Sequence, residues 1–283
     1  MLSVLQLAVV AIEYALAIAG LGYLCWLFLS GRGRALRDRP AALPRWNIAV
    51  SDFAVLGWFV LFFGFVGLAL VRMVAGPIPA AQSDGRTLKL LLYGSFPHFG
   101  AIVTWLLIRA FGHRYRPALF GPHEPSTPTS VLPAVRGGAL TFLVAMPLAL
   151  GVGFVWERFL QAVGLPTEPQ ELVGLLAQAK SPALVAFVIA LALVLAPVAE
   201  ELVFRVGIFR FLRARAPGWV AYVVSAGLFA ALHGNWFGSL PLFILGLVFA
   251  ASYERTGRIA VPMLAHALFN LNTLLLVLSG VGG

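Results

Sequence analysis

Two adjacent carboxylates, Glu200 and Glu201, stand in a segment that otherwise reads as the interior of a membrane, Leu191-Ala-Leu-Val-Leu-Ala-Pro-Val-Ala-Glu200-Glu201-Leu-Val-Phe-Arg205. Carboxylates in hydrocarbon are costly, so function is the default explanation for them. Later apolar segments add three more polar side chains, His233, His266 and Asn270. The polar residues of the C-terminal half could therefore converge on one site inside the membrane.

The positions of the two carboxylates predict different roles for them. Adjacent residues of a helix point about 100° apart, so Glu200 and Glu201 are not expected to do the same work. Arg205 follows Glu201 by four residues and shares its helical face, which makes Glu201 the structural partner of a cation. Glu200 is then left to face the histidines, and we interpret it as a general base.

The remaining polar residues suggest a hydrolytic reaction. Phe229 and His233 share one helical face, and so do His266 and Asn270, because each pair is separated by four residues. A carboxylate beside an imidazole can take a proton from water. Donors on a separate helix are what an oxyanion requires when water attacks a carbonyl. The pattern therefore indicates hydrolysis of an amide or related carbonyl within the membrane.

The spacing around the Pro217-Gly218 turn places Glu200 and His233 at a similar depth. Glu200 lies 17 residues before Pro217 and His233 lies 16 residues after it. In an antiparallel hairpin both would be about 24 Å along their helices from the turn. This depth is near the middle of a membrane.

The composition predicts an all-α, polytopic membrane helix bundle. Hydrophobic residues make up 60% of the 283-residue chain and charged residues 11%. Continuous apolar runs of about 20 residues favour helices over the alternating strands of a barrel. Eight spans are expected, at about 2–29, 48–74, 88–111, 137–162, 183–214, 218–234, 238–254 and 259–279. We interpret residues 1–283 as a single membrane domain, with variable N-terminal helices in 1–163 and a catalytic core in 183–279.

The net charge of +9 reports topology and does not indicate nucleic-acid binding, because the arginines lie in short connections between apolar runs. The basic connections at 31–47 and 112–136 are expected to be cytoplasmic, which places both termini outside the cytoplasm. The first run is expected to be a retained helix and not a cleaved leader. The one cysteine, Cys25, cannot form an internal disulfide. The segment 164–182 is expected to form a short interfacial helix, and 117–133 an exposed loop.

Three ordered motifs resemble those of the CAAX protease and bacteriocin-processing family, whose eukaryotic branch is the type II CAAX prenyl endopeptidase. They are Glu200-Glu201-x-x-x-Arg205, Phe229-x-x-x-His233 and His266-x-x-x-Asn270, and the resemblance covers about residues 183–279. It implies that Glu200 and His233 activate water and that His266 and Asn270 stabilise the oxyanion. Glu201 and Arg205 match the family's supporting pair. The expected substrate is a membrane-associated peptide or protein, lipidated or not, and no cofactor is implied. We expect a multi-pass protein of a prokaryotic plasma membrane.

Other functions are compatible with the same residues. Two histidines and a glutamate could hold zinc in a different intramembrane protease, although no H-E-x-x-H helix is present. A transporter or a non-catalytic binding or immunity protein could use the same cluster to recognise a ligand. Glu200, Glu201 and Arg205 could also form a buried ion-pair cluster that holds helices together. Glu13 and His98 are expected to have packing or pore-lining roles, since neither has a charged neighbour one turn away.

Overall fold

The computed structural model describes residues 3–44, 46, 48–79, 83–111, 131–168 and 181–281, which contain helices and no strand. Two of the helical segments, η1 and η2, are π-helical. The elements are α1 Val4–Leu29, α2 Gly31–Arg37, α3 Val50–Ala75, α4 Asp84–Gly94, α5 Phe96–Phe111, α7 Leu132–Val163, α9 Pro182–Ala190, η1 Leu191–Leu195, α10 Ala196–Glu201, η2 Leu202–Phe209, α11 Arg210–Arg213, α12 Gly218–Leu232, α13 Trp236–Thr256 and α14 Ala260–Leu278. The expected interfacial helix and exposed loop fall largely outside the described residues.

The described residues form a multi-pass helical membrane bundle, as the composition predicted. Six helices are long and apolar enough to cross a membrane, and the pair α4 and α5, bent by 40°, makes a seventh candidate span. The sixth expected span, 218–234, corresponds to α12, which is helical but has only 15 residues, so the described residues contain six or seven candidate spans and not the eight expected. The expected single helix at 88–111 is instead broken at Ser95, just before Pro97, which cannot donate a backbone hydrogen bond.

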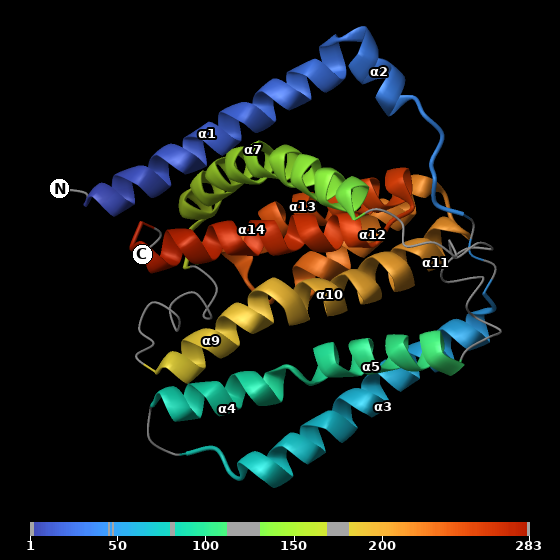
Figure 1. Cartoon of the computed structure of the whole chain (residues 1–283), viewed down its shortest axis with the longest axis vertical. Coiled ribbons are helices and arrows are strands. Elements are labelled where there is room, and N and C mark those ends of the chain that lie inside the picture. Colours follow the sequence, from blue (N-terminus) through green and yellow to red (C-terminus); the bar gives the residue numbers. More distant parts are fainter. Residues whose placement is uncertain are drawn as a thin grey trace.

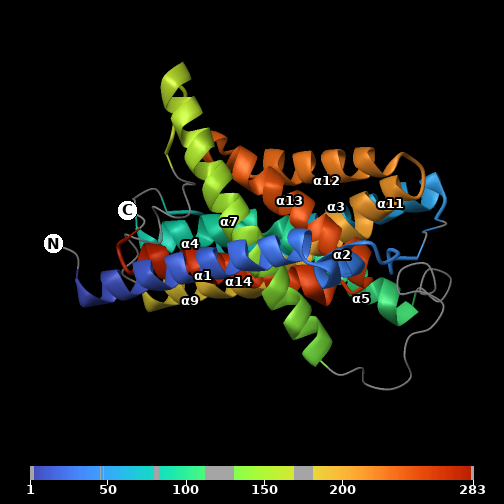
Figure 2. The same cartoon turned by 90° about the horizontal axis from the view of Figure 1, so that it is seen from above.

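The helices are arranged in successive layers (Figure 1). Helix α1 lies along one side, and α7 lies between α1 and the pair α13 and α14, packing on all three. The span from α9 to α11 follows, and α3 with α5 forms the opposite side. Seen from above, α7 crosses α1 and α14 at a steep angle (Figure 2). The span that carries Glu200 and Glu201 is therefore enclosed between the α13–α14 layer and α5.

Two glycines allow the closest helix contacts near this span. A Cβ atom at Gly246 of α13 would lie 2.8 Å from the Cα of Ala226 in α12. A Cβ atom at Gly100 of α5 would overlap the carbonyl oxygen of Val60 in α3. These close approaches leave little freedom for α13 or α5 to rotate.

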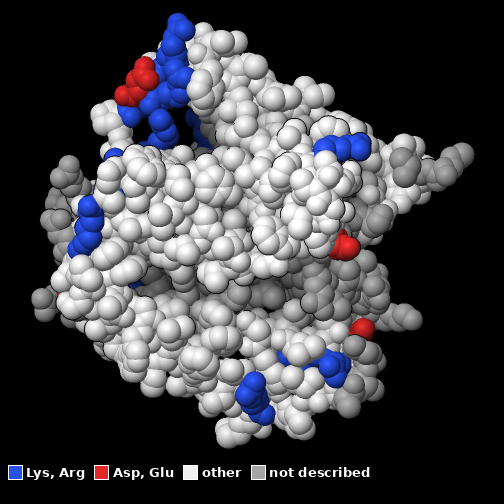
Figure 3. Space-filling view, turned by 180° about the vertical axis from the view of Figure 1, so that it is seen from behind, with Lys and Arg blue, Asp and Glu red and all other residues white. Residues whose placement is uncertain are grey.

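The arginine-bearing helices α2 and α11 lie at one end of the bundle and the termini lie at the other (Figure 1). At the basic end, Arg255 donates to the carbonyl of Arg37 at 2.6 Å, and the Nε of Arg213 lies 2.6 Å from an oxygen of Glu254. On the face seen in Figure 3, charged side chains lie at the edges and leave a broad uncharged surface between them. This distribution suits a protein surrounded by lipid, and the cytoplasmic assignment of the basic end stays a prediction.

Candidate active site

The fifth span is irregular on both sides of the two glutamates. The π-helical segments η1 and η2 flank the short α10, and such bulges are frequent at functional sites. In η1 the N–H of Ala196 donates to the carbonyl of Leu191, five residues back. In that register the carbonyl of Ala192 would accept from residue 197, but Pro197 has no N–H. This carbonyl is therefore free to accept a hydrogen bond from another helix.

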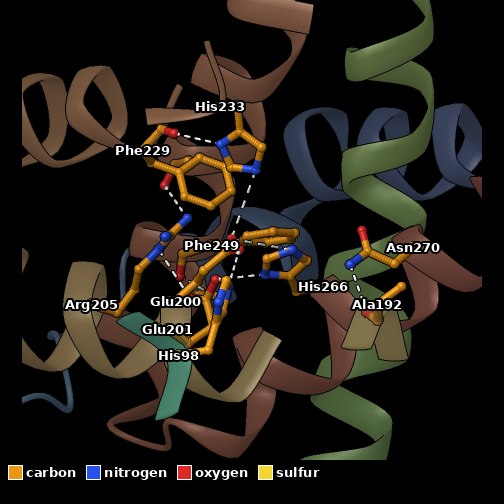
Figure 4. A network of polar contacts seen from close by, with 12 residues as sticks. His98, Ala192, Glu200, Glu201, Arg205, Phe229, His233, Phe249, His266 and Asn270 are labelled. Atoms are coloured by element: carbon orange, nitrogen blue, oxygen red, sulfur yellow. Dashed lines mark hydrogen bonds and ion pairs between the residues drawn. The ribbon is translucent and has the colours of Figure 1, made fainter. Parts of the chain in front are cut away.

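Glu200 is surrounded by three histidines from three other parts of the fold (Figure 4). Its Oε2 lies 3.9 Å from the Nε2 of His233 and 3.9 Å from the Nε2 of His266. Its Oε1 lies 3.4 Å from the Nε2 of His98, in α5. The Oε2 atom is buried and accepts no hydrogen bond from any described residue. One carboxylate oxygen therefore faces two imidazole nitrogens beyond direct hydrogen-bond distance.

His233 caps the C-terminal end of α12, where the chain turns at Gly234 with a φ of 61°. The Nδ1 atom of His233 lies 2.8 Å from the carbonyl oxygen of Phe229. A carbonyl oxygen only accepts, so Nδ1 carries the hydrogen, and in the neutral ring Nε2 has a free lone pair. That lone pair faces Glu200. The short α12 thus ends at the depth of the glutamates, as the spacing around Pro217 predicted.

His266 is oriented by Glu201. Its Nδ1 lies 3.1 Å from Oε1 of Glu201, so this nitrogen is the donor when the carboxylate is ionised, and Nε2 faces Glu200. The ring of Phe249 stacks on the imidazole at a centroid distance of 5.3 Å. His266 is buried and held by a carboxylate on one side and an aromatic ring on another. The sequence did not predict its bond to Glu201.

Glu201 and Arg205 form the expected ion pair, with Oε2 of Glu201 3.0 Å from Nε of Arg205 and both side chains 0% exposed. The guanidinium lies over the ring of Phe229 at 4.6 Å and over that of Phe249 at 5.4 Å. One of its nitrogens also donates to the carbonyl of Gly246 at 3.5 Å. The buried charge is therefore balanced by a carboxylate and by aromatic faces.

Asn270 is not in direct contact with this cluster. Its Nδ2 donates to the free carbonyl of Ala192 at 2.8 Å, so the amide joins α14 to η1 (Figure 4). This is an interhelical hydrogen bond of the kind found in many membrane bundles. The second hydrogen of Nδ2 is not used by that bond.

His98 lies outside the ordered motifs but contacts Glu200 from α5. The sequence did not indicate this contact, and the expected packing or pore-lining role stays a prediction. The two residues are 102 positions apart on different helices, so no pattern of neighbours along one helix indicates the contact. Glu13, by contrast, accepts from Asn272 at 2.8 Å, which agrees with a packing role. Among the described residues, no group of three or more His, Cys, Asp or Glu side chains has an arrangement that could hold a metal ion.

Comparison with known proteins agrees with the motifs. Residues 182–272 match the family model described as Type II CAAX prenyl endopeptidase Rce1-like. The C-terminal helices are therefore similar to this family. No solved structure matches the chain significantly.

Two relatives match part of the chain. One is "Putative membrane peptidase YdiL" of Bacillus subtilis (strain 168), 28% identical over 152 residues, which are 54% of this chain and 58% of the relative. The other is "UPF0177 protein YbdI" of Lactococcus lactis subsp. lactis (strain IL1403), 31% identical over 93 residues, which are 31% of this chain and 48% of the relative. The matches thus span about half the length of each relative.

Proposed function

We propose that the protein is an intramembrane endopeptidase in which Glu200 activates the attacking water. The observation that carries this proposal is the position of Oε2 of Glu200, 3.9 Å from the Nε2 atoms of both His233 and His266. The family match and the peptidase named among the relatives support the same reaction class.

The three atoms at this point are all hydrogen-bond acceptors when the imidazoles are neutral. The carboxylate oxygen only accepts, and the Nδ1 hydrogens of both rings are engaged elsewhere. Acceptors do not stabilise one another, but a water molecule can donate to the carboxylate oxygen and to one imidazole nitrogen at once. The cluster therefore suits a group that brings hydrogens, as the nucleophile of a hydrolysis does.

In the proposed reaction, water donates one hydrogen bond to Nε2 of His233 and loses its other proton to Oε2 of Glu200. The water oxygen forms a bond with the peptide carbonyl carbon, and the carbonyl oxygen becomes the oxyanion of a tetrahedral intermediate. The carbon–nitrogen bond then breaks as Glu200 returns the proton to the leaving amine. One water is consumed, and one carboxyl and one amino terminus are formed.

His266 and Asn270 are proposed to stabilise the oxyanion. In the resting site Nε2 of His266 is an acceptor. For the oxyanion role the ring takes up a proton from solvent as substrate binds, becomes an imidazolium, and releases this proton with the products. Glu201, 3.1 Å from Nδ1, stabilises that charge. Asn270 lies one turn further along the same helix and has one N–H beyond the bond to Ala192. Donors on α14 and a base on α10 would then act on opposite sides of one carbonyl.

The proposed substrate is a membrane-associated peptide or protein, because the cluster lies within apolar helices. The experiment that tests this function compares the membrane peptidomes of cells that express wild type or Glu200→Gln. Peptides processed only by wild type are the expected result, and each is then tested with purified enzyme in proteoliposomes. Glu13→Gln, which changes a carboxylate outside the cluster, is the matched control and should behave like wild type.

Two outcomes would contradict the proposal. If Glu200→Gln processes the same peptides as wild type, Glu200 is not the base, and a binding or immunity role explains the cluster better. If cleavage by purified wild type stops after chelation and returns with zinc, the reaction is metal-dependent and the mechanism proposed here is wrong.

A further inference from the structure

We propose that His98 is a positioning residue that holds the Glu200 carboxylate in its working orientation. This inference rests on the proposed function of Glu200. It brings into the site a helix of the N-terminal half, outside the segment that matches the family model.

The two oxygens of Glu200 have different surroundings. Oε1 lies 3.4 Å from Nε2 of His98, whereas Oε2 faces the two other histidines (Figure 4). A carboxylate can rotate about its last side-chain bond, since such torsions are broad. A donor on Oε1 limits this rotation and keeps Oε2 turned toward His233 and His266.

His98 differs from the other two histidines in the nitrogen that carries hydrogen. Its Nε2 must donate, because its partner Oε1 is an acceptor. In His233 and His266 the hydrogen is on Nδ1, and Nε2 faces the carboxylate as an acceptor. A ring that donates to Glu200 does not compete with it for the proton of water. His98 is therefore suited to hold the base and not to act as a second base.

The backbone around His98 is fixed firmly enough for such a role. His98 lies in the first turn of α5, directly after the break at Ser95, whose side chain donates to the carbonyl of Leu91 at 2.7 Å. Two residues beyond His98, Gly100 packs against the backbone of α3 without room for a Cβ atom. The side chain of His98 is 24% exposed and that of Glu200 is 17% exposed, so the contact is largely shielded from solvent.

Packing alone would not require a donor at this position, and this difference provides the test. His98→Ala removes the donor, His98→Phe keeps a ring without it, and His98→Gln restores an N–H near the former Nε2. We expect kcat to fall about 10- to 100-fold in His98→Ala and His98→Phe, because a misplaced base loses its alignment with water. KM should change less than about twofold, and His98→Gln should recover most of the loss. The assay uses an internally quenched peptide that carries the cleavage sequence found in the Glu200→Gln comparison.

A second measurement does not depend on cleavage. The chain has five histidines, so ¹⁵N-histidine spectra of purified protein can be assigned with single histidine variants. We expect His98 to carry its hydrogen on Nε2 and His233 and His266 to carry theirs on Nδ1. Glu200→Ala should shift the His98 resonances, whereas Glu13→Gln should leave them unchanged.

The outcomes separate this inference from the proposed function. If Glu200→Gln is inactive but His98→Ala and His98→Phe retain wild-type kcat, the role of His98 is wrong and that of Glu200 stands. If Glu200→Gln is active, the proposed function itself is wrong. Failure of His98→Gln to recover more activity than His98→Phe would also overturn the inference, as would His98 resonances that do not respond to Glu200→Ala.

Discussion

The Oε1 atom of Glu201 lies 3.1 Å from Nδ1 of His266, so a carboxylate buried within one helix fixes the orientation of a histidine on another. The second oxygen of Glu201 is paired with Arg205. Glu201 thus contributes both to stability and to the geometry of the proposed reaction, and the two contributions can be measured separately.

Arg205→Ala should destabilise the protein strongly. It leaves Glu201 as a buried charge without its cation, which costs about 3–5 kcal/mol. Glu200→Gln removes a charge whose side chain is partly exposed and should preserve the melting temperature. Melting curves of both variants in one detergent provide the measurement. A normal melting curve for Arg205→Ala with a collapsed Glu200→Gln would mean that the structural and catalytic carboxylates are interchanged.

The double variant Glu201→Ala/Arg205→Ala should be more stable than either single variant. Removing both partners eliminates the unpaired buried charge that each single substitution leaves behind. Activity should not recover, because His266 still lacks the carboxylate that orients it. The measurement is a double-mutant cycle read by melting temperature and by cleavage. Recovery of both properties together would contradict an orienting role for Glu201.

Glu200, His233 and His266 should not act additively. Glu200→Ala and His233→Ala should each lower kcat by about 10²- to 10⁴-fold, as expected for acid–base groups. His266→Ala should lower it about 10²- to 10³-fold, as expected for an oxyanion donor. The kcat of a double variant should be only slightly lower than that of the less active single variant, because these groups act as a unit. Full activity of any folded single variant would remove that residue from the mechanism.

The bond between Asn270 and Ala192 predicts a specific rescue. Asn270→Ala should cost about 1–3 kcal/mol, since the Ala192 carbonyl is left without a donor inside the bundle. Pro197→Ala introduces an N–H five residues after Ala192, which can take over that carbonyl. The double variant should therefore melt closer to wild type than Asn270→Ala does. An equally low melting temperature would show that the missing N–H of Pro197 is not what makes the Asn270 bond necessary.

The predicted orientation can be tested by labelling. In a Cys25→Ala background, Ser83→Cys, at the end that also holds the termini, should react with a membrane-impermeant maleimide added to intact cells. Ser30→Cys, at the arginine-rich end, should react only after the cells are opened. The reverse pattern would place the termini in the cytoplasm.

The helical fold was accessible from the sequence because long apolar runs permit few alternatives in lipid. The positions of the helices followed from these runs, and the equal depth of Glu200 and His233 followed from their distances to Pro217. The break at Ser95 was missed although Pro97 was visible, because a proline near the start of a helix is also compatible with continuous helix. The hydrogen bond from Asn270 to the carbonyl of Ala192 in η1 joins two helices, so no local pattern contains it.

The ion pair between Glu201 and Arg205 was predictable because both residues lie on one helix at a fixed spacing. The contacts of His98 with Glu200 and of His266 with Glu201 were not, since each joins helices whose relative rotation the sequence does not specify. His98 also lies outside the ordered motifs, so neither spacing nor resemblance singled it out.

The short helix α12 bears on the supply of water to this site. Its 15 residues extend about 22 Å, less than the roughly 30 Å of a hydrocarbon layer. Beyond His233 the chain continues as a turn through Gly234 and Asn235. The side-chain amide of Asn235 donates a hydrogen bond to the backbone carbonyl of Glu168. A polar turn therefore replaces the last turns of a full span on the side away from the arginines. We expect hydration to reach Glu200 by this route, so that the nucleophile comes from one aqueous compartment while a membrane substrate approaches sideways through the lipid.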